Sequence, residues 1–405
     1  MSVDTTIEGE SETEISADEA RVIEVVERLI ADHDPRSTPE RAFLEAQYDA
    51  GLAWVHFPEG EGGLGMSPKL QRTVLQRIGA AGGPMGGMKN PIGYGMCGPA
   101  VQVHGTPAQK EFLRPLFSNE HIWCQLFSEP GAGSDVASLA TRAELDGDEW
   151  IVNGQKVWTT LAQFASYGLL IARTDPELPK HRGITAFIID MHAPGVDTRP
   201  LRQMTGEAEF NEVYFTDVRI PDSMRLDDRG RGWGVSITTL MNERVSIGGG
   251  TPPRGSGPIG QLMDEFARID DPDPVQRDQV VQLWVQAEVN RLTNLRAAAN
   301  RKSGTPGPEG SVAKLAMAEL NKAIYDLALE LMGPAGMLYG KYAISEELHA
   351  LFTDDMRKNF LRARANSIEG GTSEVLRNIL GERVLGLPGD VRVDKDLPWT
   401  DVPRS

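Results

Sequence analysis

The chain has 405 residues, of which 40% are hydrophobic and 24% are charged, a composition typical of a globular protein with two or three packed units. Its formal net charge of −17 disfavours nucleic acid and anionic membrane surfaces as partners, because both would repel the average surface of the protein. A polyanionic ligand would therefore need a local basic pocket.

The N-terminal segment 1–16 is acidic and rich in Ser and Thr, and it has neither the basic nor the apolar stretch of a secretory signal. No later apolar run reaches membrane-spanning length. The two cysteines, Cys97 and Cys124, fit no metal-ligand spacing and are expected to be small buried groups. We therefore predict a disordered tail, no metal site, no membrane partner and a cytoplasmic location.

Residues 17–122 are predicted to form an N-terminal helical domain. From residue 17, apolar residues such as Val22, Val26 and Leu29 recur at the spacing of one buried helix face. Further helices are expected at about 40–51 and 68–78, with glycine-rich connections between them.

The pattern changes to short alternating segments between residues 123 and 233, where Pro, Gly and Asp divide the chain. Strands are expected at 168–173, 184–190 and 212–215. The pair Asn153-Gly154 is a strong turn signal and predicts a hairpin between residues 150–152 and 156–158. This region is therefore expected to be a small antiparallel β domain.

Helical periodicity returns in residues 234–390. Long apolar stripes follow 281–295 and 312–331, and Thr305-Pro306-Gly307-Pro308 breaks the chain between them. A final pair of helices is expected at about 346–365 and 372–385. Four long amphipathic helices with short breaks predict a bundle, followed by a C-terminal tail at 391–405.

Two segments of the β region stand out as a candidate site. Residues 125–135 read Gln-Leu-Phe-Ser-Glu-Pro-Gly-Ala-Gly-Ser-Asp, and residues 153–160 read Asn-Gly-Gln-Lys-Val-Trp-Thr-Thr. The first joins small hydroxyls to glycines that let backbone approach a ligand, and the second presents a flat aromatic beside hydroxyls. Alone, each is typical of a turn or a core strand, but together they suit a planar cofactor with polar edges.

These two segments resemble the most specific signatures of the acyl-CoA dehydrogenase flavoenzymes, and the similarity extends from about Trp54 to about Pro388. The resemblance implies an α+β multidomain fold with an N-terminal helical domain, a middle antiparallel β-barrel-like domain and a C-terminal four-helix bundle. It also implies FAD-dependent α,β-dehydrogenation of an acyl-CoA thioester to the trans-2-enoyl-CoA. Electrons would pass to an electron-transfer flavoprotein, as in the family.

The resemblance further implies which residues bind the cofactor and the substrate. The expected FAD contacts are Phe127, Ser128, Trp158, Thr160, Thr372 and Glu374. Ser134 matches a serine that contacts the CoA arm, and Arg244 matches a residue near the substrate. Residues 251–256 and 268–277 lack the Arg-x-x-Phe-Gly motif that often binds the FAD pyrophosphate. Arg277 is then the nearest basic candidate for binding the FAD pyrophosphate.

The reaction needs a carboxylate base beside the thioester, and the sequence contains two candidates for this base. Alignment on Gly371-Thr372-Ser373 places Gly370 where one branch of the family has its base, and leaves Glu369 one residue early. Glu243-Arg244 resembles the Glu-Arg pair from which another branch takes its base. A shift of one residue changes the direction in which a carboxylate points, and Glu369 is shifted in this way. Glu243 is therefore the preferred base and Glu369 the alternative. The Gly370 backbone N–H is expected to bind the thioester carbonyl.

Two other functions stay open beside the dehydrogenase. One is a flavin acyl-CoA oxidase that uses oxygen. The other is an inactive or altered subunit of a hetero-oligomer, which Gly370 and the missing pyrophosphate motif favour. Long apolar stripes on several C-terminal helices predict a homodimer or homotetramer, with a heterotetramer as an alternative. The acyl group cannot be identified, because an acyl pocket is built from scattered apolar side chains.

Overall fold

The structure is a computed structural model that describes residues 16–87, 89–248, 252–300, 309–339, 355–389, 391 and 393–403. The chain divides into two compact units, residues 1–85 and 86–405. Among the helices in the described ranges, none has the length and apolar content needed to cross a bilayer.

The first unit is helical, with α1 (Ala17–Asp32), α2 (Glu40–Asp49) and α3 (Gln71–Ala80). The Ser16 hydroxyl caps α1 by accepting from the Glu19 N–H at 3.2 Å. The apolar face predicted for α1 is buried and packs on α3. Its core contains Val22, Val26, Leu29, Phe43, Leu52, Val55, Val74 and Ile78.

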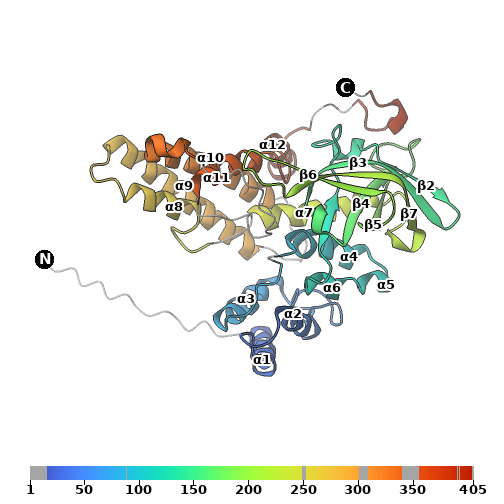
Figure 1. The fold of residues 1–405 in the computed structure, drawn as a ribbon, viewed down its shortest axis with the longest axis horizontal. Helices are drawn as coiled ribbons and strands as arrows, with labels where there is room; N and C mark the ends of the chain where they lie inside the picture. Colours follow the sequence, from blue (N-terminus) through green and yellow to red (C-terminus); the bar gives the residue numbers. More distant parts are fainter. Residues whose placement is uncertain are drawn as a thin grey trace. The chain divides into compact units, whose positions relative to one another are not determined.

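The second unit contains an eight-stranded sheet (Figure 1). Its strands are β1 (Trp123–Leu126), β2 (Arg142–Asp146), β3 (Glu149–Thr160), β4 (Tyr167–Arg173), β5 (Ile184–Asp190), β6 (Val196–Leu201), β7 (Phe210–Pro221) and β8 (Arg225–Leu226). The strand order is β6-β7-β3-β2-β4-β5-β8, with β1 beside β4. Most pairs are antiparallel, as predicted, but β4 is parallel to β1 and meets β2 at one parallel pair. Trp150, Phe187 and Val213 belong to the core of this sheet.

The hairpin predicted at Asn153-Gly154 is wrong. These residues lie inside the continuous strand β3, at a bulge opposite β7, and the turn that joins β2 to β3 contains Gly147 instead. A Cβ at position 154 would lie only 2.4 Å from the Thr141 hydroxyl oxygen, so the glycine permits a close approach and not a turn. The Asn153 amide bonds the Asp217 side chain at 3.0 Å and fixes the bulge.

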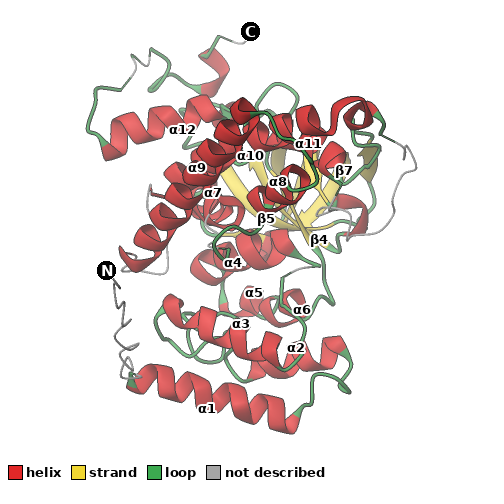
Figure 2. Cartoon of the chain, turned by 90° about the vertical axis from the view of Figure 1, so that its left-hand side faces the viewer, coloured by secondary structure: helices red, strands yellow, loops and turns green. Residues whose placement is uncertain are grey.

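Helices precede and follow the sheet. They are α4 (Gly98–His104), α5 (Pro107–Lys110), α6 (Leu113–Phe117), α7 (Gly232–Gly248), α8 (Pro258–Phe266), α9 (Pro274–Asn300), α10 (Glu309–Met332), α11 (Met356–Asn366) and α12 (Ser373–Ile379). Helix α10 packs against α7, α8, α9 and α11, and α7 also contacts β4 and β5. Figure 2 shows α8, α10 and α11 in front of the strands. The predicted fold class, with helical parts around a middle sheet, is confirmed.

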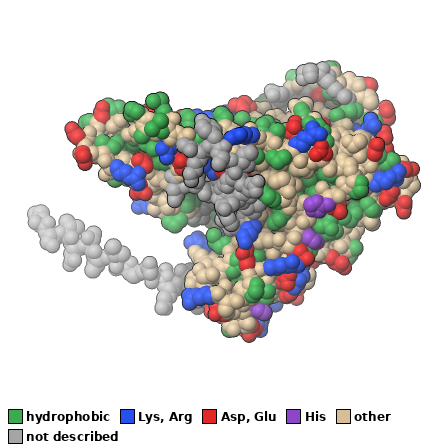
Figure 3. All heavy atoms as spheres, in the orientation of Figure 1, with side chains coloured by type: hydrophobic (Ala, Val, Ile, Leu, Met, Phe, Trp, Pro, Cys, Tyr) green, Lys and Arg blue, Asp and Glu red, His purple; other side chains and the backbone are tan. Residues whose placement is uncertain are grey.

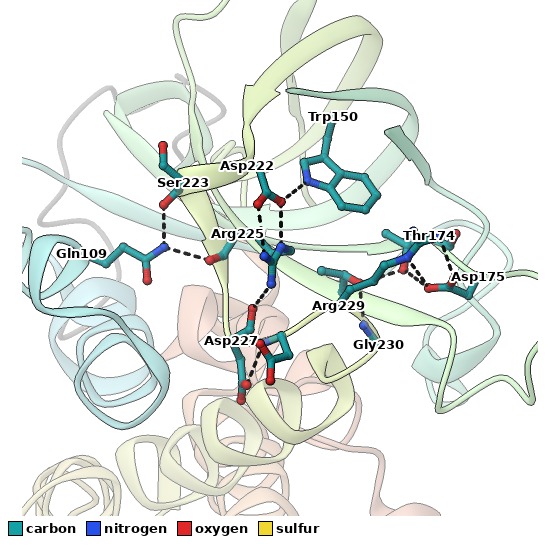
Figure 4. A network of polar contacts seen from close by, with 12 residues as sticks. Gln109, Trp150, Thr174, Asp175, Asp222, Ser223, Arg225, Asp227, Arg229 and Gly230 are labelled. Carbon is teal, nitrogen blue, oxygen red and sulfur yellow. Dashed lines mark hydrogen bonds and ion pairs between the residues drawn. The ribbon is translucent and has the colours of Figure 1, made fainter. Parts of the chain in front are cut away.

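A polar network holds the segment between β7 and α7 against the sheet (Figure 4). Arg225 pairs with Asp222 at 2.7 Å and donates to the Asp227 carbonyl at 2.7 Å. The Trp150 indole donates to Asp222 at 2.8 Å, so the network reaches the core of the sheet. His104 lies between Asp227, at 2.8 Å, and the Thr238 hydroxyl on α7, at 2.9 Å. The start of α7 is thereby fixed by side chains from distant parts of the sequence.

Three predicted features fall outside the described residues. These are the N-terminal tail at 1–16 except Ser16, the break at Thr305-Pro306-Gly307-Pro308 and the first part of the helix expected at 346–365. The described part of that helix is α11, and the helix expected at 372–385 begins as α12 with Thr372 as its cap.

Candidate active site

A cavity of about 1260 Å³ lies in the second unit. It is lined by the loop after β1, the end of β3, helix α7, helix α11 and the turn before α12. Nine of the twelve residues predicted for the site are among its lining residues: Phe127, Ser128, Ser134, Trp158, Thr160, Glu243, Glu369, Gly370 and Thr372. The structure therefore brings together residues that lie up to about 245 positions apart in the chain, from Phe127 to Thr372.

The loop after β1 is locked to β3 by a buried ion pair. The Lys156 ammonium, whose side chain has no exposed surface, lies 2.8 Å from the Glu129 carboxylate and 3.0 Å from the Phe127 carbonyl. The Glu129 carboxylate also accepts from the backbone N–H groups of Ala140 and Thr141 at 2.7 and 2.9 Å. Burial disfavours the Glu129 carboxylate, but Lys156 and these bonds outweigh burial and lower its pKa. The loop is thus held rigidly at the cavity wall.

Trp158 has an unusual conformation at the end of β3. Its φ is +60°, a region that non-glycine residues rarely adopt, and it falls within a register shift between Lys156 and Thr159. Its side chain is 60% exposed, lines the cavity and meets Phe210 edge to face at 6.0 Å between ring centroids. A strained backbone that turns a large aromatic ring outward is typical of a ligand-binding site.

These residues fit a flavin. The cavity offers the Trp158 ring as an aromatic wall and the hydroxyls of Ser128 and Thr160 on the same lining. The side-chain oxygen of Gln125 is buried and has no hydrogen-bond partner among the residues that the structure describes, so it could accept a bond from a ligand. An aromatic face with hydrogen-bonding groups beside it suits a planar, polar-edged ring system.

Glu243 lies on α7, in a partly buried position at the cavity. The neutral amide of Gln125 donates to its carboxylate at 3.2 Å. Neighbouring positions of α7 add the apolar side chains of Ile237, Leu240 and Met241 to the lining. Burial, Cys124 and the nearby Glu243 charge all raise the pKa of the Cys97 thiol, so the carboxylate lies near this buried thiol. Such surroundings suit a carboxylate that accepts a proton.

Glu369 lines the same cavity but is held differently. Its carboxylate receives two bonds from the Arg362 guanidinium, at 2.8 and 3.2 Å, and one from the Asn366 amide at 2.8 Å. Arg362 also lies 3.5 Å from Glu209 and 5.5 Å from the ring centre of Phe210. The geometry makes Glu369 part of a charged cluster beside the Trp158 wall.

The turn between Glu369 and α12 depends on its glycines. Gly370 has φ +61° and Gly371 has φ +89°, which a residue with a side chain would adopt only with strain. The buried Lys314 ammonium donates to the Gly371 carbonyl at 2.7 Å, and the Thr372 hydroxyl caps α12 by accepting from Val375 at 3.2 Å. Gly370 therefore presents backbone, and no carboxylate, at this point of the cavity.

Two of the other predicted residues, Glu374 and Arg277, are not among the described residues that line the cavity. Glu374 lies in the first turn of α12, exposed and 3.6 Å from Arg377. Arg277 is exposed in the first turn of α9. Arg244 lies in α7, but its side chain is outside the described part of the structure. Sequence reasoning gave no role to Gln125, Arg362 or Phe210, because their importance depends on partners from other elements.

The cavity lining is basic although the chain is acidic. Its basic residues are Lys180, His181, Arg202, Arg362, Arg364, Arg383 and Lys395, and its acidic residues are Asp135, Glu243, Glu369 and Asp394. This excess of basic groups provides the local pocket that a polyanionic ligand needs in a chain of net charge −17.

Comparisons with known proteins match most of the chain. Three family models match, described as the acyl-CoA dehydrogenase N-terminal domain at residues 13–120, the middle domain at 124–218 and the C-terminal domain at 230–385. Acyl-CoA dehydrogenase IpdE1 of Mycobacterium tuberculosis is 36% identical, with 87% of this chain and 89% of that protein covered. Acyl-CoA dehydrogenase FadE34 of the same organism is 38% identical over 86% of this chain, but this chain spans only 47% of its length.

Solved structures with the same fold include two whose names join two components. The ChsE4-ChsE5 complex of Mycobacterium tuberculosis matches with a TM-score of 0.70 and 26% identity, covering 94% of this chain and all of that chain. The Tcur3481-Tcur3483 steroid ACAD matches with a TM-score of 0.70 and 25% identity, covering 93% of this chain and 99% of that chain.

Proposed function

Because this chain belongs to the acyl-CoA dehydrogenase family of FAD-dependent oxidoreductases, we propose that it oxidises an acyl-CoA thioester to the 2-enoyl-CoA with Glu243 as the base. Bound FAD supplies the acceptor for the hydride that leaves the β-carbon. The Glu243 carboxylate takes the proton from the α-carbon, next to the thioester carbonyl. The single observation that carries this proposal is the position of Glu243 on the cavity wall, beside the neutral Gln125 amide and apolar side chains of α7.

The turn before α12 supports the other half of this step. As the α-proton leaves, negative charge grows on the thioester oxygen and needs a hydrogen-bond donor. The Gly370 N–H lies on a turn that the Lys314 bond to Gly371 holds in place, at the cavity lining. We propose that this N–H binds the carbonyl oxygen. Trp158, Thr160, Ser128 and Phe127 would hold the flavin, and Ser134 the CoA arm.

Flavin reduction tests the proposal directly. Under anaerobic conditions, a series of acyl-CoA thioesters is added to the FAD-loaded protein and the loss of flavin absorbance is followed. Glu243→Gln keeps the shape of the carboxylate but cannot take a proton, so we expect reduction to slow by about 10²- to 10⁴-fold while FAD stays bound. Normal reduction by Glu243→Gln would show that another group is the base.

We propose that the electron acceptor is an electron-transfer flavoprotein, because FadE34 and IpdE1, two relatives of this chain, are named acyl-CoA dehydrogenases. Rapid hydrogen peroxide release during turnover in air would instead identify an acyl-CoA oxidase. An electron-transfer flavoprotein that restores flavin absorbance after substrate reduction would support the dehydrogenase.

The acyl group is proposed to be bulky. One structure of the same fold, 25% identical to this chain, is named a steroid ACAD. The series of thioesters should therefore include steroid-derived acyl groups beside linear and branched ones. Faster reduction by short linear acyl-CoAs than by any polycyclic one would contradict this choice.

We propose that the chain assembles through α9. Four large apolar side chains of this helix share one exposed stripe: Val281, Val285, Val289 and Leu292, which are 52, 49, 58 and 51% exposed. Figure 3 shows apolar side chains at the surface of the α8–α9 end, among charged ones. Burying such a stripe needs a partner helix. The partner is a second copy or, as the name of the ChsE4-ChsE5 complex suggests, a related chain.

Light scattering tests this assembly. The wild-type protein should be a dimer or tetramer at micromolar concentration, and Val285→Asp should lower the mass. A monomer with FAD bound would point to the hetero-oligomer, in which case co-expression with a related chain should restore the larger mass.

A further inference from the structure

The segment after α12 is docked on the β domain. Over residues 393–403, the Trp399 N–H donates to the Leu178 carbonyl at 2.9 Å and the Thr400 N–H donates to Pro176 at 3.2 Å. Pro398 pairs with Pro179 as an isolated antiparallel bridge. These bonds define a strap, residues 393–403, along the loop between β4 and β5.

Trp399 anchors the strap to a buried cation. The Arg173 guanidinium lies 4.9 Å from the centre of the Trp399 ring, and the Trp399 indole donates to the Ser138 carbonyl at 3.3 Å. Arg173 is buried and donates to the carbonyls of Ala137 and Lys180 at 2.6 Å each. One anchor therefore joins the strap to the loop that follows Ser134 and to the loop that carries Lys180.

The strap also brings charges to the cavity. The Lys180 ammonium lies 2.9 Å from Asp135 and 2.7 Å from Asp394 of the strap, so two carboxylates neutralise it. Lys395, the next residue, is exposed at the cavity lining and has no ion-pair partner among the residues that the structure describes. Arg362 and Arg364 of the same lining are already paired with Glu369 and Asp326. The strap thus adds an unpaired cation to the cavity lining that also contains Ser134 and His181.

We propose that the strap forms one wall of the substrate entrance and that the Lys395 ammonium binds a phosphate of the CoA moiety. This inference rests on the proposed function, which makes the substrate a CoA thioester. CoA carries several phosphates, and the chain has a net charge of −17, so the average surface of the protein repels CoA. An unpaired cation at the cavity provides local attraction for these phosphates. FAD also carries phosphates. However, Trp158, the proposed flavin contact, packs against Phe210, and the charged group over Phe210 is Arg362, which does not belong to the strap.

Binding of CoA itself tests the inference without knowledge of the acyl group. CoA is titrated calorimetrically into the FAD-loaded full-length protein at low and at high salt. We expect Lys395→Ala to weaken CoA binding roughly fivefold at low salt, and the difference to shrink at high salt because salt screens exposed charges. Trp399→Ala, which frees the strap, should weaken CoA binding similarly. Lys395→Arg should bind nearly as wild type, and Lys69→Ala, an exposed lysine of the first unit, serves as the matched control.

Each other outcome overturns the inference. Unchanged CoA affinity in Lys395→Ala would show that the ammonium binds no phosphate. A loss that does not depend on salt, or that Lys395→Arg shares, would show that the residue acts through shape. Loss of FAD with unchanged CoA affinity would assign the cation to the flavin. If the wild-type protein binds no CoA at all, the proposed function itself is contradicted, and flavin reduction by the thioester series would then fail as well.

Discussion

The Glu369 carboxylate lies 2.8 Å from the Arg362 guanidinium in a two-bond ion pair, with the Asn366 amide as a third donor. A carboxylate in this position cannot take a proton without giving up a charge-assisted pair in a partly buried site. Glu243, on α7, is held by the neutral Gln125 amide. We therefore propose different roles for the two glutamates that line one cavity: Glu369 organises the Trp158 side, and Glu243 accepts the proton.

The first prediction compares Glu369→Gln with the Glu243 variant. Glutamine at position 369 can still accept from Arg362, and Glu209, 3.5 Å from the guanidinium, keeps the cation paired. We expect flavin reduction within about threefold of wild type in anaerobic stopped-flow measurements, against the large loss expected for Glu243→Gln. The opposite pattern would mean that Glu369 leaves Arg362 when substrate binds and acts as the base.

The second prediction concerns the buried Lys156–Glu129 pair. Lys156→Met leaves the Glu129 carboxylate buried without its cation, which should lower the free energy of unfolding by about 3–5 kcal/mol. The loop that carries Ser128 should loosen, so FAD should also be lost more readily on dilution. Chemical denaturation and released flavin fluorescence measure the two effects.

A double variant and a surface variant are the controls for this prediction. Lys156→Met with Glu129→Leu removes both charges and should recover much of the lost stability. Arg219→Met breaks exposed pairs with Asp146 and Glu149, at 3.1 and 3.0 Å, and should change the stability far less, because solvent screens exposed charges. Equal losses in Lys156→Met and Arg219→Met would show that the buried pair has no special role.

The third prediction is a dependence of stability on pH. The pKa of Glu129 is lower in the folded protein than its ordinary value of 4.5, despite burial, chiefly because of Lys156. A lowered folded pKa gives stability that is fully present above 4.5 and is lost as pH falls through the folded value. The free energy of unfolding, measured from neutral to acidic pH, should therefore fall less steeply in the double variant than in wild type. Parallel pH profiles would refute this contribution.

The fold could be predicted from the sequence wherever a local pattern decides the structure. The periodicity of Val22, Val26 and Leu29 predicted α1 and its buried face, and short alternating segments predicted β4 and β5. The signal at Asn153-Gly154 misled because a bulge needs the same residue types as a turn, and the contact with Thr141 that explains Gly154 is not a local feature.

The site residues could be proposed only through resemblance, and their partners could not be proposed at all. Lys156 lies 27 positions from Glu129, and His104 lies 123 positions from Asp227, so the bonds between them exist only once the chain is folded. The strap is similar: residues 391–405 have the composition of a tail, yet Trp399 meets Arg173 and Asp394 meets Lys180. Pairing of this kind depends on tertiary geometry, which no spacing in the sequence encodes.

The last prediction concerns Trp158, whose backbone and side chain have opposite effects on stability and binding. Because φ is +60°, Trp158→Gly should relieve strain, and since the ring is 60% exposed little burial is lost. The FAD-free variant should therefore be as stable as wild type or about 1 kcal/mol more stable. Loss of the ring should nevertheless weaken FAD binding by roughly tenfold or more, because the aromatic wall is gone.

Leu161 provides the matched control for Trp158. It has nearly the same φ, +61°, but its side chain is only 2% exposed. Leu161→Gly gains the same relief of strain and loses a buried leucine, so its net effect should be a destabilisation of about 2 kcal/mol or more. Denaturant unfolding of the FAD-free proteins and fluorescence titration with FAD separate the two quantities. If Trp158→Gly binds FAD as tightly as wild type, the ring does not face the flavin, and the strain at this position must serve another purpose.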